Sequence, residues 1–215
     1  MRRAASVVGA RPVPGQPVPP VVARIGLDRD PFDVTDADDR RWLHACLPPD
    51  QPERAARLEA ELALAAACRP VLLRGDLVDA VAEAVARVPP GALPVVTTTW
   101  ALSRVRPGRR PRFLDRLRQA AAGRTVAWVS AEGVGVAPGI PTLGDRPASG
   151  HSIIGLALLT GADTRAVALG RCWSRGRLLA WLADPEPGDG GAAPAASGTA
   201  GPGRAGSGTA GAGAR

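Results

Sequence analysis

The chain has 215 residues, of which 45% are hydrophobic and 22% are charged, and its formal net charge is +7. These values fit one globular domain with additional chain, and they exclude a collagen, a coiled coil and a disulfide-rich miniprotein. Lysine is absent, so all 27 basic residues are arginine, and alanine occurs 41 times. This bias is typical of a GC-rich coding sequence, so the positive charge is weak evidence for a nucleic-acid partner.

Both ends of the chain differ in composition from its middle. Residues 1–19 contain four prolines between residues 12 and 19, which favours an extended chain, and the apolar part after Met1-Arg2-Arg3 is short for a signal peptide. Residues 184–215 contain no leucine, isoleucine, valine or aromatic residue, so we expect a disordered tail. We therefore predict one domain over residues 20–183. No apolar stretch is long enough to span a membrane, and we expect a cytoplasmic protein.

Within residues 20–183, β-branched runs alternate with helical periodicity. Four helices are predicted. The first begins at the capping pattern of residues 35–38, the second at Pro52, the third after the turn at 75–76, and the fourth covers residues 111–122. Nearly continuous apolar strands are predicted at 21–27, 71–74, 95–99 and 125–130. Strands that alternate with helices are typical of a parallel sheet covered on both faces. The final runs, 153–160, 165–171 and 177–182, instead predict an antiparallel meander.

The predicted fold class is thus α/β: a Rossmann-like, mostly parallel sheet with helices on both faces and a C-terminal antiparallel meander. In such sheets, ligands bind at the carboxyl ends of the strands. Asp28 follows the first strand, Asp76 the second and Glu132 the fourth. Carboxylates in these places could accept hydrogen bonds from ribose hydroxyls, so these three residues are the candidate cofactor-binding residues. The alternative is that such acids stabilise loops and helix N-termini.

Other motifs in the sequence provide little evidence for a phosphate-binding, metal-binding or catalytic site. The nearest match to a phosphate-binding loop, residues 133–139, has its last glycine one place late and no helical pattern after it. No metal-ligand spacing or nucleophile motif is found. His44 fits a structural role, whereas His151 in a polar loop is a minor acid–base candidate. The three cysteines, Cys46, Cys68 and Cys172, are widely spaced, and we expect reduced, buried thiols.

The strongest local positive field lies between residues 104 and 118, where Asp115 is the one acidic residue. An arginine-rich helix face is usually solvated, but contacts with RNA or another polyanion would use the same side chains. No aromatic residue is interleaved to stack on bases. A polyanion-binding module is therefore an alternative function, and its candidate residues are Arg104, Arg106, Arg109, Arg110, Arg112, Arg116 and Arg118.

Several motifs together resemble a bacterial family known as domain of unknown function 2332. They are Gly26-Leu-Asp-Arg-Asp-Pro-Phe-Asp-Val-Thr-Asp36, Arg41-Trp-Leu43, Gln51-Pro-Glu-Arg54, Arg74-Gly-Asp-Leu77, Trp128-Val-Ser-Ala-Glu-Gly-Val-Gly135 and Gly176-Arg-Leu-Leu-Ala-Trp-Leu182. The resemblance covers about residues 20–183, the C-terminal half of the family's pattern. It implies a methyltransferase-like Rossmann fold. In that fold Asp28 and Asp76 would face the ribose and adenine of S-adenosylmethionine.

The sequence also departs from the family's pattern. The family carries a glycine-rich first strand and turn of the form Gly-Ala-Ser-Ala-Gly-Leu-Asn, and nothing similar occurs here. The sequence has Thr97-Thr-Thr99 where the family shows Phe-His-Ser, and Ser130-Ala-Glu132 where it shows Ser-Asn-Glu. Because the first strand lies in the middle of this topology, its absence would expose strand edges to a partner chain. At these two places in the sequence, residues 97–99 and 130–132, the family residues best suited to proton transfer or ligand contact are therefore absent.

These observations give three hypotheses. The first is a shortened methyltransferase-like module without complete catalytic machinery and with no firmly implied cofactor. The second is a working S-adenosylmethionine-dependent methyltransferase in which Asp28, Asp76 and Glu132 hold the cofactor. The third is the arginine-mediated polyanion binder. The sequence favours the first, and so leans against an enzyme, because the glycine-rich turn that approaches the cofactor is not recognised.

Overall fold

The computed structural model describes residues 5–15, 17–161, 163–173 and 176–183. Its α-helices are α1 (Ala37–Ala45), α2 (Pro52–Ala67), α3 (Leu77–Ala86) and α4 (Arg110–Ala120). Among the described residues, short 3-10 helices are η1 (Leu102–Arg104), η2 (Pro107–Arg109) and η3 (Pro147–Ser149). The predicted tail at 184–215 lies outside the described residues.

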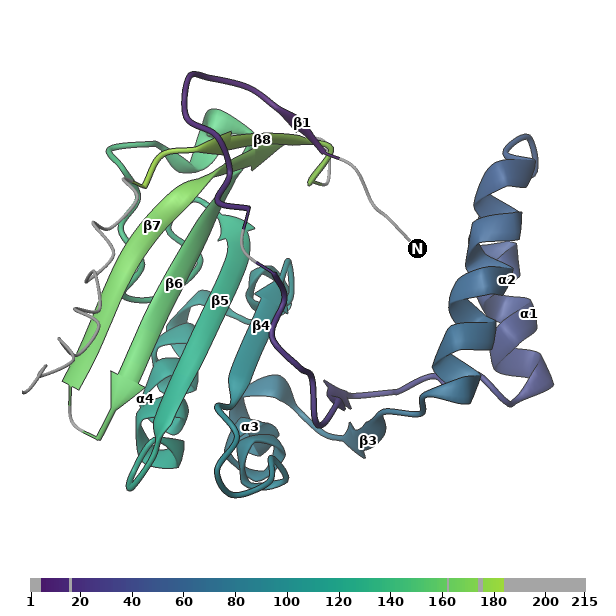
Figure 1. Cartoon of the computed structure of the whole chain (residues 1–215), viewed down its shortest axis with the longest axis horizontal. Helices are drawn as coiled ribbons and strands as arrows, with labels where there is room; N and C mark the ends of the chain where they lie inside the picture. The colour runs from purple at the N-terminus through teal and green to yellow at the C-terminus, as the bar shows by residue number, and fades with distance from the viewer. Residues whose placement is uncertain (1–4, 16, 162, 174–175, 184–215) are drawn as a thin grey trace, which may run out of the picture. The chain divides into compact units, whose positions relative to one another are not determined.

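The strands form two sheets (Figure 1). The larger sheet has the order β1-β8-β7-β6-β5-β4, and the smaller one pairs β2 with β3. The bounds of the strands are β1 (Ser6–Val7), β2 (Ile25–Asp28), β3 (Val71–Arg74), β4 (Val95–Thr99), β5 (Thr125–Gly133), β6 (Ser152–Thr160), β7 (Asp163–Trp173) and β8 (Leu178–Trp181).

The α/β class and the C-terminal antiparallel meander are confirmed, but the large sheet is mixed rather than mostly parallel. Parallel pairing joins β2 to β3, β4 to β5 and β1 to β8. Pairing is antiparallel between β5 and β6, β6 and β7, and β7 and β8. Apolar runs do not reveal pairing direction, whereas short turns between consecutive strands permit only antiparallel neighbours. The pair β1–β8 was not predicted.

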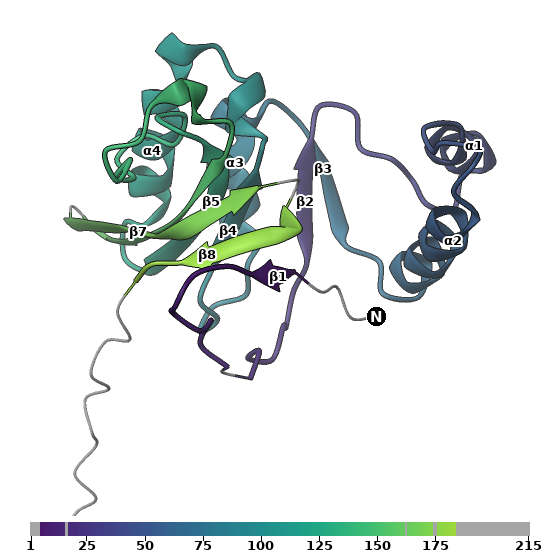
Figure 2. The same ribbon diagram turned by 90° about the horizontal axis from the view of Figure 1, so that it is seen from above.

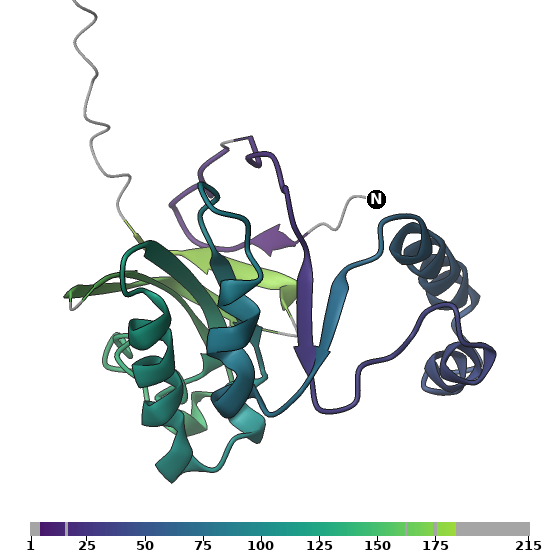
Figure 3. The same ribbon diagram turned by 90° about the horizontal axis from the view of Figure 1, so that it is seen from below.

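Two helices cover one face of the large sheet (Figures 2 and 3). Val78, Val81 and Val85 are the buried residues of α3, and Phe113 and Leu117 are buried in α4. They pack with buried Val126, Trp128 and Leu159 of the sheet in one core. Alternation along the strands turns Val95, Leu158 and Val167 to the opposite face, where they are exposed. The prediction of helices on both faces is therefore wrong for this sheet, because these side chains on its second face are exposed. The other two helices, α1 and α2, lie between β2 and β3 in the chain.

The two sheets end at unpaired strand edges. The N–H of Ala127 donates to the carbonyl of Pro94, and the N–H of Trp100 donates to the carbonyl of Ala131. Because alternate residues of a parallel strand bond to each neighbour, the backbone groups of Val95, Thr97 and Thr99 point away from β5. No described strand pairs with that edge of β4 or with a second edge of β2. Helix α3 contacts β2, and Leu27 packs against the core of the large sheet.

Local capping explains where α1 begins. The carboxylate of Asp36 accepts hydrogen bonds from the N–H groups of Asp38 and Asp39 at 2.9 and 3.0 Å. The helix therefore begins after Asp36, rather than after a Thr35 cap as the sequence pattern suggested. The hydroxyl of Thr35 donates instead to Asp33. None of the described helices is both long and apolar enough to cross a membrane.

Candidate functional site

Asp28 and Asp76 lie after neighbouring strands of the small sheet, as the sequence predicted. Asp28 ends β2 and is exposed, and its carboxylate accepts a hydrogen bond from the N–H of Asp30 at 3.0 Å. Arg74, which pairs with Asp28 in the β2–β3 register, forms an ion pair with Asp30. The carboxylate of Asp28 thus braces a turn, and its exposed side remains open to a ligand.

Asp76 is more strongly engaged. Its carboxylate accepts a hydrogen bond from the N–H of Val78 at 2.9 Å, which caps α3, and it pairs with Arg29 and Arg109. The hydrogen bond from Arg29, with further contributions from Val78 and Arg109, lowers the pKa of Asp76 from 3.8 to about 2, although partial burial opposes the shift. The side chain is 20% exposed. The carboxylate is therefore ionised at neutral pH and already surrounded by donors from this chain.

Arginines connect this strand end to the helices. Arg109 of η2 contacts Asp76 and also donates to Asp79 of α3 at 2.9 Å. Arg112 of α4 lies 3.9 Å from the second oxygen of Asp79. The network therefore joins the loop after β2 to α3 and α4. It fixes the position of Asp76 but also occupies the oxygens that a ribose would use.

Asp76 gives a pH-dependent prediction. Its pKa is depressed in the folded state, so its contribution to stability is complete above the unfolded value of 3.8 and is lost as the pH falls through about 2. Asp76→Asn should lower the free energy of unfolding by about 1–2 kcal/mol at pH 7, and the difference from the parent chain should shrink below pH 4. Urea unfolding across this pH range measures the difference, and Asp50→Asn, an exposed change, is the control. An unchanged difference at low pH would contradict the assignment.

Glu132 does not join the other two acids. Its side chain is buried, with 1% exposure, and it lies within β5, one residue before the end of the strand, rather than after the strand as predicted. One carboxylate oxygen accepts hydrogen bonds from the N–H groups of Ala101 and Leu102, both at 3.0 Å. The other accepts from the N–H of Ser103 at 3.2 Å and from its hydroxyl at 3.0 Å. The carboxylate thus holds the start of η1, and all four bonds come from this chain.

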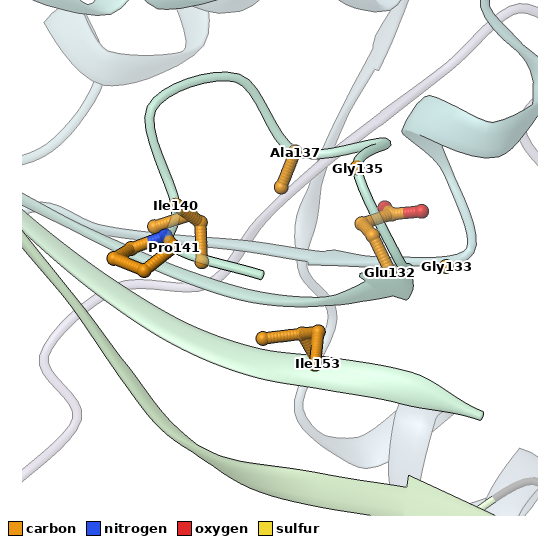
Figure 4. Close-up of a pocket in the computed structure, with 7 residues that line it drawn as sticks. All are labelled: Glu132, Gly133, Gly135, Ala137, Ile140, Pro141 and Ile153. Carbon is orange, nitrogen blue, oxygen red and sulfur yellow. The ribbon is translucent and has the colours of Figure 1, made fainter. Parts of the chain in front are cut away.

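The space beside Glu132 is too small for a cofactor. A cavity of about 10 Å³ lies between the end of β5, the loop after it and β6. Figure 4 shows Ala137, Ile140 and Ile153 converging on it from the loop and from β6. This volume admits about one water molecule. The glycine-containing loop at 133–139 therefore packs on the sheet, with Val134 buried, and does not form an open phosphate cradle.

Most side chains of the arginine cluster have partners within the protein. Arg110 donates to the carbonyls of Leu102 and Val105, and Arg118 pairs with Asp115. Together with Arg109 and Arg112, they act mainly as internal links. Among the described residues, no side-chain partner is found for exposed Arg104 and Arg106. Arg116 donates to Gln119. Binding of a polyanion stays a prediction, and it would use Arg104, Arg106 and the donors that the internal contacts of the other arginines leave over.

The structure also shows a cluster that sequence reasoning only partly recognised. Buried His151 lies 2.9 Å from the carboxylate of Asp145, and Arg171 of β7 binds the same carboxylate at 2.6 and 2.9 Å. These donors lower the pKa of Asp145, with Arg171 contributing most. The cluster fastens the loop before β6 to β7. A polar loop with an Asp six residues before a His was the available signal, but Arg171 is distant in the sequence.

The cysteine and histidine predictions have mixed outcomes. Cys46 and Cys68 are exposed, so the expectation of buried thiols is wrong for both, because each follows the end of a helix at the surface. Cys172 is partly buried, and burial raises the pKa of its thiol. His44 pairs with Glu59, which links α1 to α2 and agrees with a structural role. Among the described residues, no three potential metal-ligating side chains cluster.

Comparison with known proteins adds a family to this description. The model of a family described as an uncharacterized protein conserved in bacteria (DUF2332) matches residues 1–181. The match includes the proline-rich start and the whole α/β sheet region. No curated protein and no solved structure matches the chain. The chain therefore belongs to this bacterial family, as its motifs suggested.

Proposed function

We propose that this chain is a methyltransferase-like Rossmann module that lacks complete catalytic machinery of its own. The observation that carries the proposal is the interruption between β2 and β4, which separates the two sheets. In a doubly wound sheet, the order of parallel strands is 3-2-1-4-5, and the first strand occupies the middle. The pairs β3–β2 and β4–β5 correspond to the strands on either side of that middle position.

The interruption affects the place where a ligand would bind. In this class of fold, the turn after the middle strand supplies backbone amides to the ligand, next to the acid that binds the ribose. No such turn is present among the described residues beside Asp28 and Asp76. The oxygens of Asp76 are held by Arg29, Val78 and Arg109. An isolated chain with this arrangement offers a cofactor one exposed carboxylate, that of Asp28, and little enclosing surface.

The burial of Glu132 also supports the proposal that this module is not catalytic. A carboxylate that acts on a cofactor or substrate must reach it, whereas the oxygens of Glu132 are buried against η1. The free edges of β2 and β4 are where the partner strand suggested by the sequence would pair. That partner, the candidate site residues and a cytoplasmic location all stay predictions.

Titration of the purified chain with S-adenosylmethionine tests the proposal. Isothermal calorimetry should show no saturable binding in the micromolar range, because the described residues provide no amide-bearing turn beside Asp28 and because Asp76 is already paired. Saturable binding that is lost in Asp28→Ala and Asp76→Ala, but retained in the exposed control Asp50→Ala, would reject the proposal in favour of a working transferase. Far-ultraviolet circular dichroism of each variant checks that the loss is not caused by unfolding.

A further inference from the structure

A second concave feature lies at the opposite end of the small sheet from Asp28 and Asp76. It is a hollow of about 330 Å³ between the segment that leads into β2, the segment between α2 and β3, and the end of α3. This volume is at the lower end of the range for small-molecule sites. Its lining residues are Val22, Ala23, Arg24, Ile25, Cys68, Arg69, Val71 and Arg87.

The lining has positive charge and no acidic residue. Among the described residues, no partner is found for the exposed side chain of Arg24. Hydrogen bonds from Thr35 lower the pKa of Asp33, and the charge of Arg69 adds a smaller contribution, but no hydrogen bond joins Arg69 to Asp33 in the described chain. Arg87 donates to Glu83 at 2.9 Å through one nitrogen, and a guanidinium has five N–H donors. Each arginine therefore keeps donors for a ligand.

The walls between these arginines are apolar. Val22 is 68% exposed and Val71 is 50% exposed, although valine is usually buried. Ile25, the first residue of β2, completes this surface. A ligand that covered these side chains and satisfied the guanidinium groups would need an anionic end and an apolar body.

We propose that this hollow binds a small organic oxyanion, meaning a phosphate or carboxylate group attached to an apolar body. The planar guanidinium donates two parallel hydrogen bonds to such an oxyanion, and this geometry distinguishes it from simple charge attraction. Arg24 and Arg69 lie on the two segments that enter the neighbouring strands β2 and β3, and both line the hollow. This proposal does not depend on the proposed function, because the hollow contains none of the candidate cofactor-binding acids Asp28, Asp76 and Glu132.

Cys68 provides a reporter for occupancy, because it is exposed and lines the hollow. Cys46 is also exposed but does not line it, so it is an internal control. With phenyl phosphate as the probe, alkylation of Cys68 by iodoacetamide should slow about tenfold when the probe stands at about ten times its Kd. Alkylation of Cys46 should be unchanged. Mass spectrometry of tryptic peptides measures the two rates separately.

Matched variants distinguish the site from the general positive charge. Arg24→Gln combined with Arg69→Gln should weaken protection of Cys68, with each lost charged donor reducing affinity about tenfold or more. Arg104→Gln combined with Arg106→Gln removes the same charge from exposed residues elsewhere and should leave protection intact. Thermal unfolding of both double variants confirms that they fold.

Benzoate and phenyl phosphate compare carboxylate with phosphate, and either one is consistent with the proposal if it protects Cys68 more than phenol does. Equal protection by phenol would show that apolar contact alone is responsible and would overturn it. Absence of protection by both anions, equal protection of Cys46, or equal loss in both double variants would also overturn it.

Discussion

Replacing Glu132 by alanine should lower the free energy of unfolding by about 3 kcal/mol or more. The carboxylate accepts hydrogen bonds from the N–H groups of Ala101, Leu102 and Ser103, and from the hydroxyl of Ser103. The acid is 1% exposed, so its removal leaves several polar groups of η1 without an acceptor in a buried place. Each unsatisfied group costs about 1–3 kcal/mol, reduced where water enters the cavity.

Urea unfolding of the parent chain and the variant measures this effect. Glu132→Gln should be intermediate, since it keeps one oxygen acceptor but brings an amide N–H group towards other donors. Glu53→Ala, at the exposed start of α2, is the control and should change stability by less than about 1 kcal/mol. If Glu132→Ala unfolds at the same urea concentration as the parent chain, the structural role of this carboxylate is wrong and a ligand-binding role regains support.

The position of Glu132 in the sequence could not reveal that role. The residue lies at the end of a buried strand, and an acid in that place has the same pattern whether it binds a ligand or an internal loop. Its partners lie about thirty residues earlier, where the chain turns at Trp100 with a φ of 54°. This turn presents successive N–H groups to one carboxylate. Nothing in Thr97-Thr-Thr99 or the residues after it marks the turn.

Helices and most strands were more accessible to prediction. Valines spaced three and four residues apart identify α3, and Pro52 marks the start of α2, because helix periodicity and capping are local properties. The strands β3 and β4 match their predicted bounds. The predicted strand 21–27 is shorter and displaced, since β2 covers Ile25–Asp28. Proximity to Pro19 and Pro20 does not favour earlier pairing.

The candidate site was predictable in location but not in its ion pairs. Asp28 and Asp76 do lie at the carboxyl ends of neighbouring parallel strands, which follows from the βα pattern. The links from Asp76 to Arg29 and Arg109 depend on tertiary packing of the loop after β2 against η2. An arginine cluster therefore suggested a polyanion surface from the sequence, although several of its members are paired with acids inside the fold.

Trp128→Ala should have the largest effect on stability of the variants considered, about 3–5 kcal/mol. The indole is fully buried at the centre of the core and meets Phe113 edge-on, with ring centroids 5.3 Å apart. Its N–H donates to the hydroxyl of Thr98 at 3.0 Å. A loss comparable to typical total domain stability is expected, so the variant should unfold at low urea concentration or fail to fold. Trp42→Ala, which is 61% exposed in the parent chain, is the matched control.

A double-mutant cycle separates packing from the hydrogen bond. Trp128→Phe keeps an aromatic ring but removes the indole N–H, and Thr98→Val removes the acceptor while it keeps a branched side chain. Either change alone should cost about 1–3 kcal/mol, because it leaves a buried polar group unpaired or a smaller ring in the core. The double variant should be more stable than the sum of the single losses predicts, by about 1 kcal/mol. Strict additivity would mean that the bond between β5 and the edge strand β4 contributes nothing, and that packing against Phe113 alone fixes the indole.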